Sequence, residues 1–376
     1  MPLGIYVHLP FCPYVCPYCD FAKWPFARSR AARYLDALNA EIAALPAQPA
    51  STIFIGGGTP NTYPPASIAA LIATLRERFP AAAARHEISI EINPELARER
   101  AMDEYTAAGI DRISIGVQSF EPREIAVLGR RHTRADIEHA VEQARRAGAR
   151  SVSLDLIFGV PGQSAQSWER SLDAALALGV DHISTYGLTV EAGTPYERWR
   201  EAEPAAFADD EAEAELYEIA ITRLEAAGYE QYEISNFARP SHRCAHNENY
   251  WRNGEYLGLG VGAASYRGGE RSVHTRDLEQ YMSSALAGRP IPGQSERLEG
   301  LPAVGEALML ALRTAQGVAL EEFKERYGVD VAERYAPVIA RYEGDGLLER
   351  SGHGIRLTKR GRFLANDVCG AFVTFT

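Results

Sequence analysis

The residues with the clearest chemistry are three cysteines in one short segment, Cys12-x3-Cys16-x2-Cys19, out of five in the whole chain. Prolines and aromatic residues around them argue against a continuing helix or strand, so the three sulfurs can approach one object from different directions. Thiolates are preferred ligands of soft metals. The spacing therefore predicts a metal centre.

Two kinds of metal centre suit this spacing. A cubane [4Fe-4S] cluster has four irons, so three thiolates would leave one iron open to a ligand from outside the protein. A zinc site is the structural alternative, with His8, Asp20 or Cys244 as its fourth ligand. A thioredoxin-like redox pair is disfavoured because a third cysteine is present.

Three consecutive glycines, Gly56, Gly57 and Gly58, precede Thr59 and Pro60 and follow an apolar run over residues 52–55. Glycine lets the backbone approach a ligand closely and exposes N–H and C=O groups to it. A tight turn between a strand and a helix is the alternative explanation.

Polar residues lie at or just beyond the ends of three further apolar runs: Glu91, Gln118 and Asp155. A carboxylate that faces inward from an apolar strand is costly unless it has a partner. A hydrogen-bonded structural role would explain each one alone, but three at the same end of a sheet favour a polar ligand. Arg130 follows them and could pair with a carboxylate of that ligand; an exposed cation at a helix end is its alternative.

A further candidate is His246, in the stretch His-Asn-Glu-Asn-Tyr-Trp over residues 246–251. A histidine beside two aromatic residues and a glycine-rich segment at 258–262 could supply a ligand and a stacking surface for a flat cofactor. A surface loop with a hydrogen-bonded histidine is the alternative.

Short apolar runs and amphipathic segments alternate over residues 3–190 and must position these residues. Six strands are predicted, at 4–9, 52–56, 87–92, 112–117, 152–159 and 182–190, with helices at 31–45, 66–79, 136–147 and 167–178. This alternation predicts a parallel sheet. Because the runs look apolar on both faces, a doubly wound sheet and a partial barrel both satisfy the pattern. In either fold, ligand sites lie at the carboxyl ends of the strands.

The composition changes after about residue 205. An acidic amphipathic helix is predicted over 209–227, then a strand over 231–237 and a polar loop that contains Cys244 and His246. A segment with proline and glycine at 289–293 is typical of a linker. Helices over 304–313, 320–327 and 332–345 and a hairpin over 347–357, with its turn at 351–354, indicate a small winged-helix-like domain. We therefore expect domains at 1–205, 206–290 and 291–376.

Bulk properties narrow the classes of protein. A chain of 376 residues with 46% hydrophobic content is typical of a globular protein with its own core. An odd number of cysteines with three clustered fits metal binding in a reducing compartment better than a disulfide framework. A net charge of -11 argues against a sequence-independent grip on nucleic acid. No leader-like start and no apolar run of about 20 residues is found, so we expect a cytoplasmic protein with no membrane span and at most peripheral membrane association.

The cysteine spacing, its place after the first predicted strand and its companion motifs resemble the radical S-adenosylmethionine (SAM) superfamily. The resemblance implies an α/β fold with a partial (β/α)6 barrel and a [4Fe-4S] cluster held by Cys12, Cys16 and Cys19. It also implies SAM bound at the open iron. In the coproporphyrinogen-dehydrogenase-like branch, the positions that contact SAM correspond to Tyr6, Gly57, Gly58, Thr59, Glu91, Gln118, Arg130 and Asp155.

Within this branch, the stretch at 246–251 resembles the HNxxYW motif of the haem-chaperone family HemW. That resemblance runs over the whole chain, and it implies haem as cargo with His246 as its axial ligand and Cys244 as a weaker candidate. It also implies a recipient haemoprotein and an electron donor of the flavodoxin or ferredoxin type.

Two features separate this family from its relatives. Phe21 stands where oxygen-independent coproporphyrinogen III dehydrogenases carry a fourth cysteine, and the first strand begins at residue 3 without their N-terminal extension. Both features favour the chaperone over the decarboxylating enzyme. The HNxxYW stretch disfavours the class C radical SAM methyltransferases, which share the barrel motifs.

Overall fold

The computed structural model describes residues 3–83, 86–97, 99–352 and 354–375. Its main element is a mixed twelve-stranded sheet in the order β14-β13-β12-β11-β1-β4-β5-β6-β7-β8-β10-β9. The neighbouring strands from β11 to β8 are all parallel, and the strands outside them pair antiparallel. The six predicted strands are therefore confirmed, and they form one continuous parallel array.

The bounds of these strands are β1 (Gly4–Leu9), β4 (Thr52–Gly57), β5 (Glu87–Ile92), β6 (Arg112–Gln118), β7 (Ser151–Phe158), β8 (His182–Gly187), β9 (Glu230–Gln231), β10 (Asn236–Ala238), β11 (Tyr256–Leu259), β12 (Ala264–Arg267), β13 (Glu270–His274) and β14 (Gly293–Arg297). The helices of this part are α1 (Arg28–Ala44), α2 (Pro65–Arg78), α3 (Glu99–Ala108), α4 (Pro122–Val127), α5 (Arg134–Arg146), α6 (Ala165–Ala177), α7 (Pro195–Ala202), α8 (Asp210–Ala226), α9 (Ala245–Trp251) and α10 (Leu278–Leu286).

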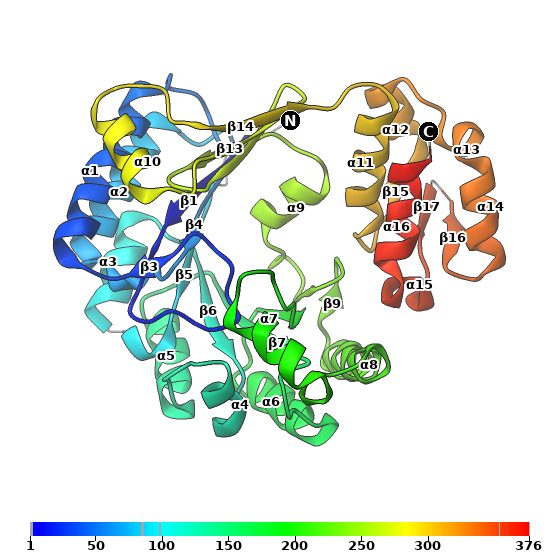
Figure 1. The fold of residues 1–376 in the computed structure, drawn as a ribbon, viewed down its shortest axis with the longest axis horizontal. Helices are drawn as coiled ribbons and strands as arrows, with labels where there is room; N and C mark the ends of the chain where they lie inside the picture. The colour runs from blue at the N-terminus through cyan, green and yellow to red at the C-terminus, as the bar shows by residue number, and fades with distance from the viewer. Residues whose placement is uncertain (1–2, 84–85, 98, 353, 376) are drawn as a thin grey trace.

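The helices of the alternating array lie on the outer side of a curved sheet (Figure 1). A doubly wound sheet would carry helices on both faces. The arrangement is therefore the partial barrel, and the doubly wound alternative is wrong.

The two faces of the parallel strands differ in polarity. Outward residues such as Ile53, Ile90 and Leu154 are fully buried against the helices. The alternate residues line an interior cavity, and most of them are polar: Tyr6, Glu91, Arg112, Ser114, Ser153, Asp155, His182 and Ser184. The expectation of strands apolar on both faces is therefore wrong, because the period of two brings only every second side chain to the helix layer.

Four predictions beyond residue 205 need correction, three of them before the C-terminal helices. The run over 231–237 is not one strand, because β9 and β10 are two short antiparallel strands joined by a turn. His246 does not lie in a polar loop but in helix α9. The predicted linker ends at Gly293, where β14 begins and pairs with β13, so the first residues of the expected domain 291–376 extend the large sheet.

The remaining residues form a small domain with its own core. Its three-stranded sheet has the order β15-β17-β16, and the expected winged-helix-like pattern of helices and a hairpin is present. Residue 353 of the predicted turn lies outside the described residues. The elements are α11 (Leu301–Leu312), β15 (Val318–Ala319), α12 (Leu320–Tyr327), α13 (Val331–Arg334), α14 (Ala336–Gly344), β16 (Leu348–Ser351), β17 (Gly354–Leu357), α15 (Lys359–Phe363) and α16 (Ala365–Thr374). The helix predicted over 332–345 is thus two helices, α13 and α14.

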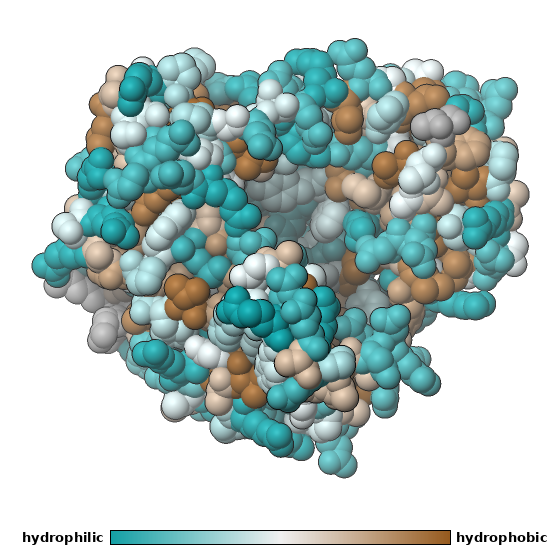
Figure 2. Space-filling view, viewed as in Figure 1, coloured by the Kyte–Doolittle hydropathy of each residue, from teal (hydrophilic) through white to brown (hydrophobic). Residues whose placement is uncertain are grey.

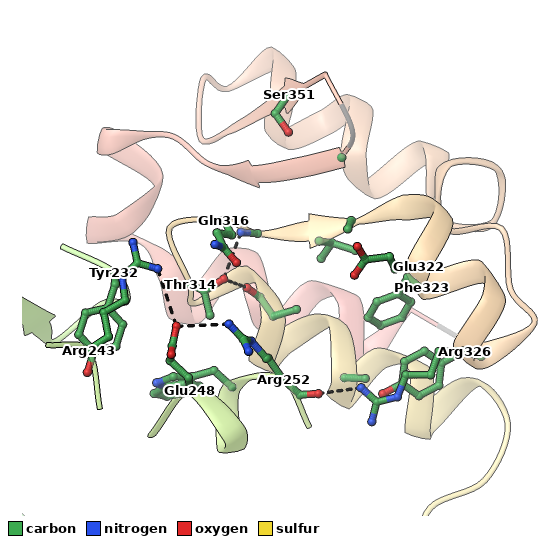
Figure 3. Close-up of a pocket in the computed structure, with 18 residues that line it drawn as sticks. Tyr232, Arg243, Glu248, Arg252, Thr314, Gln316, Glu322, Phe323, Arg326 and Ser351 are labelled. Atoms are coloured by element: carbon green, nitrogen blue, oxygen red, sulfur yellow. Dashed lines mark hydrogen bonds and ion pairs between the residues drawn. The ribbon is translucent and has the colours of Figure 1, made fainter. Parts of the chain in front are cut away.

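The C-terminal domain contacts the end of α9 directly, and the two together line a cleft of about 490 Å³ (Figure 3). Arg326 of α12 donates from Nη1 to the carbonyl oxygen of Arg252 at 2.7 Å and from Nη2 to that of Asn253 at 2.6 Å. The side-chain amide of Asn253 donates a hydrogen bond to the Tyr327 hydroxyl at 3.2 Å. Hydrogen bonds from a charged donor are stronger than neutral ones, so these contacts fix α9 to the domain. No helix among the described residues is long and apolar enough to cross a membrane.

We expect Arg326→Ala to lower the free energy of unfolding by about 1–2 kcal/mol, because two charge-assisted hydrogen bonds are lost. Urea unfolding would measure this, and limited proteolysis should cut faster between β14 and α11. Lys324→Ala is the matched control, since Lys324 lies on the same helix and pairs with Asp330 within the domain. Equal proteolysis of the two variants would contradict the role of Arg326.

Candidate functional site

The cysteine segment follows β1 and lies at the carboxyl ends of the parallel strands. A short parallel pair closes it, β2 (Phe11–Cys12) with β3 (Trp24–Pro25), and the Phe26 amide donates to the Cys12 carbonyl at 2.8 Å. Beside it is a pocket of about 400 Å³. All predicted site residues except Tyr6, His246 and the weaker candidate Cys244 line this pocket: Cys12, Cys16, Cys19, Gly57, Gly58, Thr59, Glu91, Gln118, Arg130 and Asp155.

The three thiols face this common pocket. Burial raises the pKa of Cys12 to about 11 and also raises that of Cys19, so ligation would release their protons. Among the described residues, no three His, Cys, Asp or Glu side chains are placed to hold a single metal ion. A cubane cluster spans four irons, and its ligand sulfurs lie farther apart than the ligands of one zinc ion. The three-thiol donor set and the open pocket fit a cluster that leaves one iron to a ligand from outside the protein.

Each of the three glycines has a separate packing reason. A Cβ on Gly56 would lie 2.6 Å from Oε2 of Glu91, and one on Gly58 would lie 2.7 Å from the Pro10 backbone. Gly57 has a φ of 106°, and a Cβ there would collide with the His8 ring. The segment is thus more than a tight turn, because it packs directly against the cysteine segment and the Glu91 carboxylate.

Two carboxylates, Glu91 and Asp155, line the same pocket as the three cysteines. Glu91 accepts a hydrogen bond from the Gly57 amide at 3.1 Å, yet burial and the nearby Asp155 raise its pKa to about 7. Asp155 accepts from Ser184 at 2.7 Å and from Ser114 at 3.0 Å, and burial raises its pKa as well. This pair is costly to keep ionised without a cationic ligand.

Gln118 reaches the pocket from the end of β6, and Arg130 reaches it from the loop after α4. Arg130 donates from Nη2 to Oδ1 of Asn93 at 2.9 Å and lies with Nη1 4.0 Å from the Cys16 sulfur. Within the described residues its buried Nε has no hydrogen-bond partner, which leaves a donor for an anionic group. Gln118 follows a bulge opposite β7 and has a φ of 64°, a conformation that costs free energy for a non-glycine residue.

Two supporting residues were missed by sequence reasoning. Asn93 orients Arg130, and its position two residues after Glu91 on the same face could have identified it. Glu95 accepts from the Tyr14 hydroxyl at 2.6 Å and so holds the cysteine segment against the barrel. Only the fold brings these two segments together.

Tyr6 and His246 lie together in a neighbouring interior cavity of about 200 Å³, which Glu91, Asp155 and Gly57 also line. His246 is 1% exposed, with Nδ1 2.8 Å from the Thr52 hydroxyl and Nε2 2.8 Å from the Tyr250 hydroxyl. Its ring stacks on Phe54 at 5.2 Å, and burial lowers its pKa to about 3. The imidazole is therefore neutral, and both ring nitrogens are occupied in this conformation.

Comparison with known proteins gives the class that this geometry defines. The model of the radical SAM superfamily matches residues 6–175, and that of the HemN C-terminal domain matches residues 303–364. The solved structure of coproporphyrinogen III oxidase HemN from Escherichia coli, a radical SAM enzyme, covers 100% of this chain. The match spans 91% of that chain, with a TM-score of 0.86 and 26% identity.

Full-length relatives narrow the class to one family. The heme chaperone HemW of Bacillus subtilis (strain 168) is 35% identical over 98% of this chain and 98% of the relative. The heme chaperone HemW of Mycobacterium tuberculosis (strain ATCC 25618 / H37Rv) is 38% identical over 98% of this chain and 94% of the relative. The chain belongs to the HemW family of radical SAM proteins. Membership of the superfamily implies a [4Fe-4S] cluster and SAM, and the three thiols, the glycine cradle and the unpartnered Arg130 Nε fit both.

We expect Gly58→Ala to push the cysteine segment away from β4, because the new methyl group meets the Pro10 backbone. The free energy of unfolding should fall by about 1–3 kcal/mol, and iron and sulfide content after anaerobic reconstitution should fall with it. Gly344→Ala, where a Cβ meets no atom within 4 Å, is the control and should change neither. Full iron content in Gly58→Ala would argue against the close contact.

The raised pKa of Glu91 gives a pH-dependent stability difference. In the unfolded chain this carboxyl ionises near 4.5, and in the folded chain near 7, so its ionisation destabilises the fold as pH rises through this window. The cofactor-free Glu91→Gln variant should match the wild type near pH 4.5 and exceed its free energy of unfolding by up to about 3 kcal/mol at pH 8. Urea titrations across this range measure the difference. The exposed Glu299→Gln should show no such trend, and a flat difference for Glu91→Gln would refute the assignment.

Proposed function

We propose that this protein is a haem chaperone that holds a [4Fe-4S] cluster and SAM and delivers haem to a target haemoprotein. The full-length similarity to proteins named heme chaperone HemW carries the proposal. It is supported by helix α9, which contains the HNxxYW motif and lies against Glu91 and Asp155 of the same barrel. When bound, the cluster would supply an electron to SAM, with a flavodoxin or ferredoxin as its donor, and we place the protein in the cytoplasm.

The residues of the pocket divide this task. Cys12, Cys16 and Cys19 would hold the cluster. Gly57, Gly58 and Thr59 would present backbone groups to the amino end of SAM, while Glu91 would balance its ammonium charge. Arg130 would bind its carboxylate, and Gln118, Asp155 and Tyr6 would line the rest of the site. An enclosed barrel also keeps water from a reactive intermediate.

His246 is the proposed axial ligand of haem iron. Its ring is neutral, as ligation requires, but Tyr250 covers Nε2. Ligation therefore requires the Tyr250 side chain to move. Because Arg326 of α12 binds the residues that directly follow α9, a shift of the C-terminal domain could move this helix and Tyr250 with it.

Haem titration of the anaerobically reconstituted protein tests the proposal. Wild-type protein should bind haem stoichiometrically, and His246→Ala should weaken binding about tenfold or more while the iron–sulfur absorbance persists. His139→Ala, at an exposed position of α5, is the matched control. Absence of haem binding by the wild type would reject the chaperone function, and unchanged binding by His246→Ala would reject the ligand alone.

Coproporphyrinogen III oxidation is the second candidate function, because the HemN structure superimposes over the whole chain. Phe21 disfavours it, since this position carries the fourth cysteine in those enzymes. Formation of 5′-deoxyadenosine coupled to a decarboxylated porphyrinogen would establish the oxidase, and haem transfer to an acceptor without such a product would exclude it.

A further inference from the structure

A groove of about 510 Å³ lies beside the cysteine segment, on the opposite side of Phe21 from the SAM pocket. Strands β11 to β13, helix α9 and Leu310 of α11 enclose it. Figure 2 shows the surface hollowed between the barrel and the C-terminal domain. We call the groove of about 510 Å³ the arginine groove, after Arg271 and Arg276. Its other defining residues are Phe21, Tyr250, Tyr256 and Val273.

The walls of the arginine groove are mostly apolar and aromatic. Phe21 is 61% exposed and Val273 is 36% exposed, so both present apolar surface to a ligand. Tyr250 and Tyr256 stand edge to face with ring centroids 4.6 Å apart. Flat surfaces of this kind suit a planar apolar ligand, and the volume lies within the range of about 300–1,000 Å³ for small-molecule sites.

The two arginines place guanidinium groups at the rim of the groove. Arg276 donates to Oδ1 of Asp20 at 3.1 Å and is 59% exposed, and Arg271 pairs with Glu306 beyond the groove. Asp20 is the one acidic residue among the described residues that line the groove. Exposed ion pairs contribute little to the free energy of folding, so a ligand carboxylate can replace Asp20 as the partner of Arg276. The planar guanidinium group binds carboxylates in a bidentate manner.

The other cavities fit a planar dicarboxylate less well. The interior cavity has a volume of about 200 Å³ and contains Glu91 and Asp155, so it is small and acidic. The cleft in Figure 3 mixes arginines with Glu248 and Glu322. The SAM pocket must hold the cluster.

We propose that the arginine groove receives the porphyrin ring of haem, with its two carboxylates on Arg271 and Arg276. This inference rests on the proposed haem-chaperone function and names the place where haem binds. The ring then lies on one side of Tyr250 and His246 on the other, so that movement of this one side chain exposes the ligand to the iron.

A double-mutant cycle on the reconstituted full chain tests the groove. Its two axes are the Arg271→Ala/Arg276→Ala double variant and haem whose carboxylates are both esterified. Each change alone should weaken binding about tenfold, and the double variant should not distinguish the two forms of haem. Val273→Asp should weaken haem binding by a similar factor. Because the Val273 side chain is partly exposed, we expect this variant to fold.

Two matched controls isolate the groove. Arg252→Ala removes a charge from the neighbouring cleft, and its exposure of 62% is close to that of Arg276. Leu286→Asp alters an exposed apolar residue of α10. Both should bind haem within about twofold of wild type. Retained iron–sulfur absorbance and circular dichroism identify folded variants.

The remaining outcomes overturn the inference in different ways. If wild type binds haem and the arginine and Val273 variants do so equally well, the groove is wrong and the chaperone function survives. If Arg252→Ala alone weakens binding, haem lies in the cleft of Figure 3. If wild type binds no haem, the proposed function fails and the groove with it.

Discussion

The structure depends on the burial of polar side chains inside a barrel whose outer layer is aliphatic. Helix packing against the outward residues stabilises the sheet, while the inward residues lose contact with bulk water. Asp155 accepts hydrogen bonds from two serine hydroxyls, and within the described part of the chain Glu91 accepts one from a backbone amide, yet burial raises the pKa of both carboxyls. The stability of the outer layer therefore allows interior carboxylates that lack enough hydrogen-bond donors. Such carboxylates favour a polar, cationic ligand.

The cysteine segment is built on one edge of this interior. Its own small strand pair fixes its ends, and the glycines after β4 let it approach the barrel. Tyr14 and Glu95 hold its middle. The same segment separates two cavities, because Phe21 and Asp20 line both the SAM pocket and the arginine groove. A movement of this segment would therefore alter both cavities, which gives a physical route between them.

Helix α9 links the barrel to the C-terminal domain. On one side His246 bonds to Thr52 of β4, and on the other Arg326 of α12 binds the carbonyl groups of Arg252 and Asn253, which directly follow the helix. Tyr250 lies between the His246 ring and the arginine groove. The position of this helix is thus set by contacts from two parts of the chain, neither of them close to it in sequence.

Local patterns determined much of the molecule. The Cys12 to Cys19 spacing, the glycine run, the six strands and most helices could be predicted because each depends on residue type and short periodicity. The polar inner face could also have been found, since the alternation over residues 88–92 has a period of two. Only the tertiary structure decided that His246 is buried in a helix, that β14 belongs to the large sheet, and that Phe21, Tyr250 and Arg276 share one groove. These facts depend on packing between segments far apart in the chain, and a hydrogen-bond partner such as Thr52 for His246 leaves no local signature in the sequence.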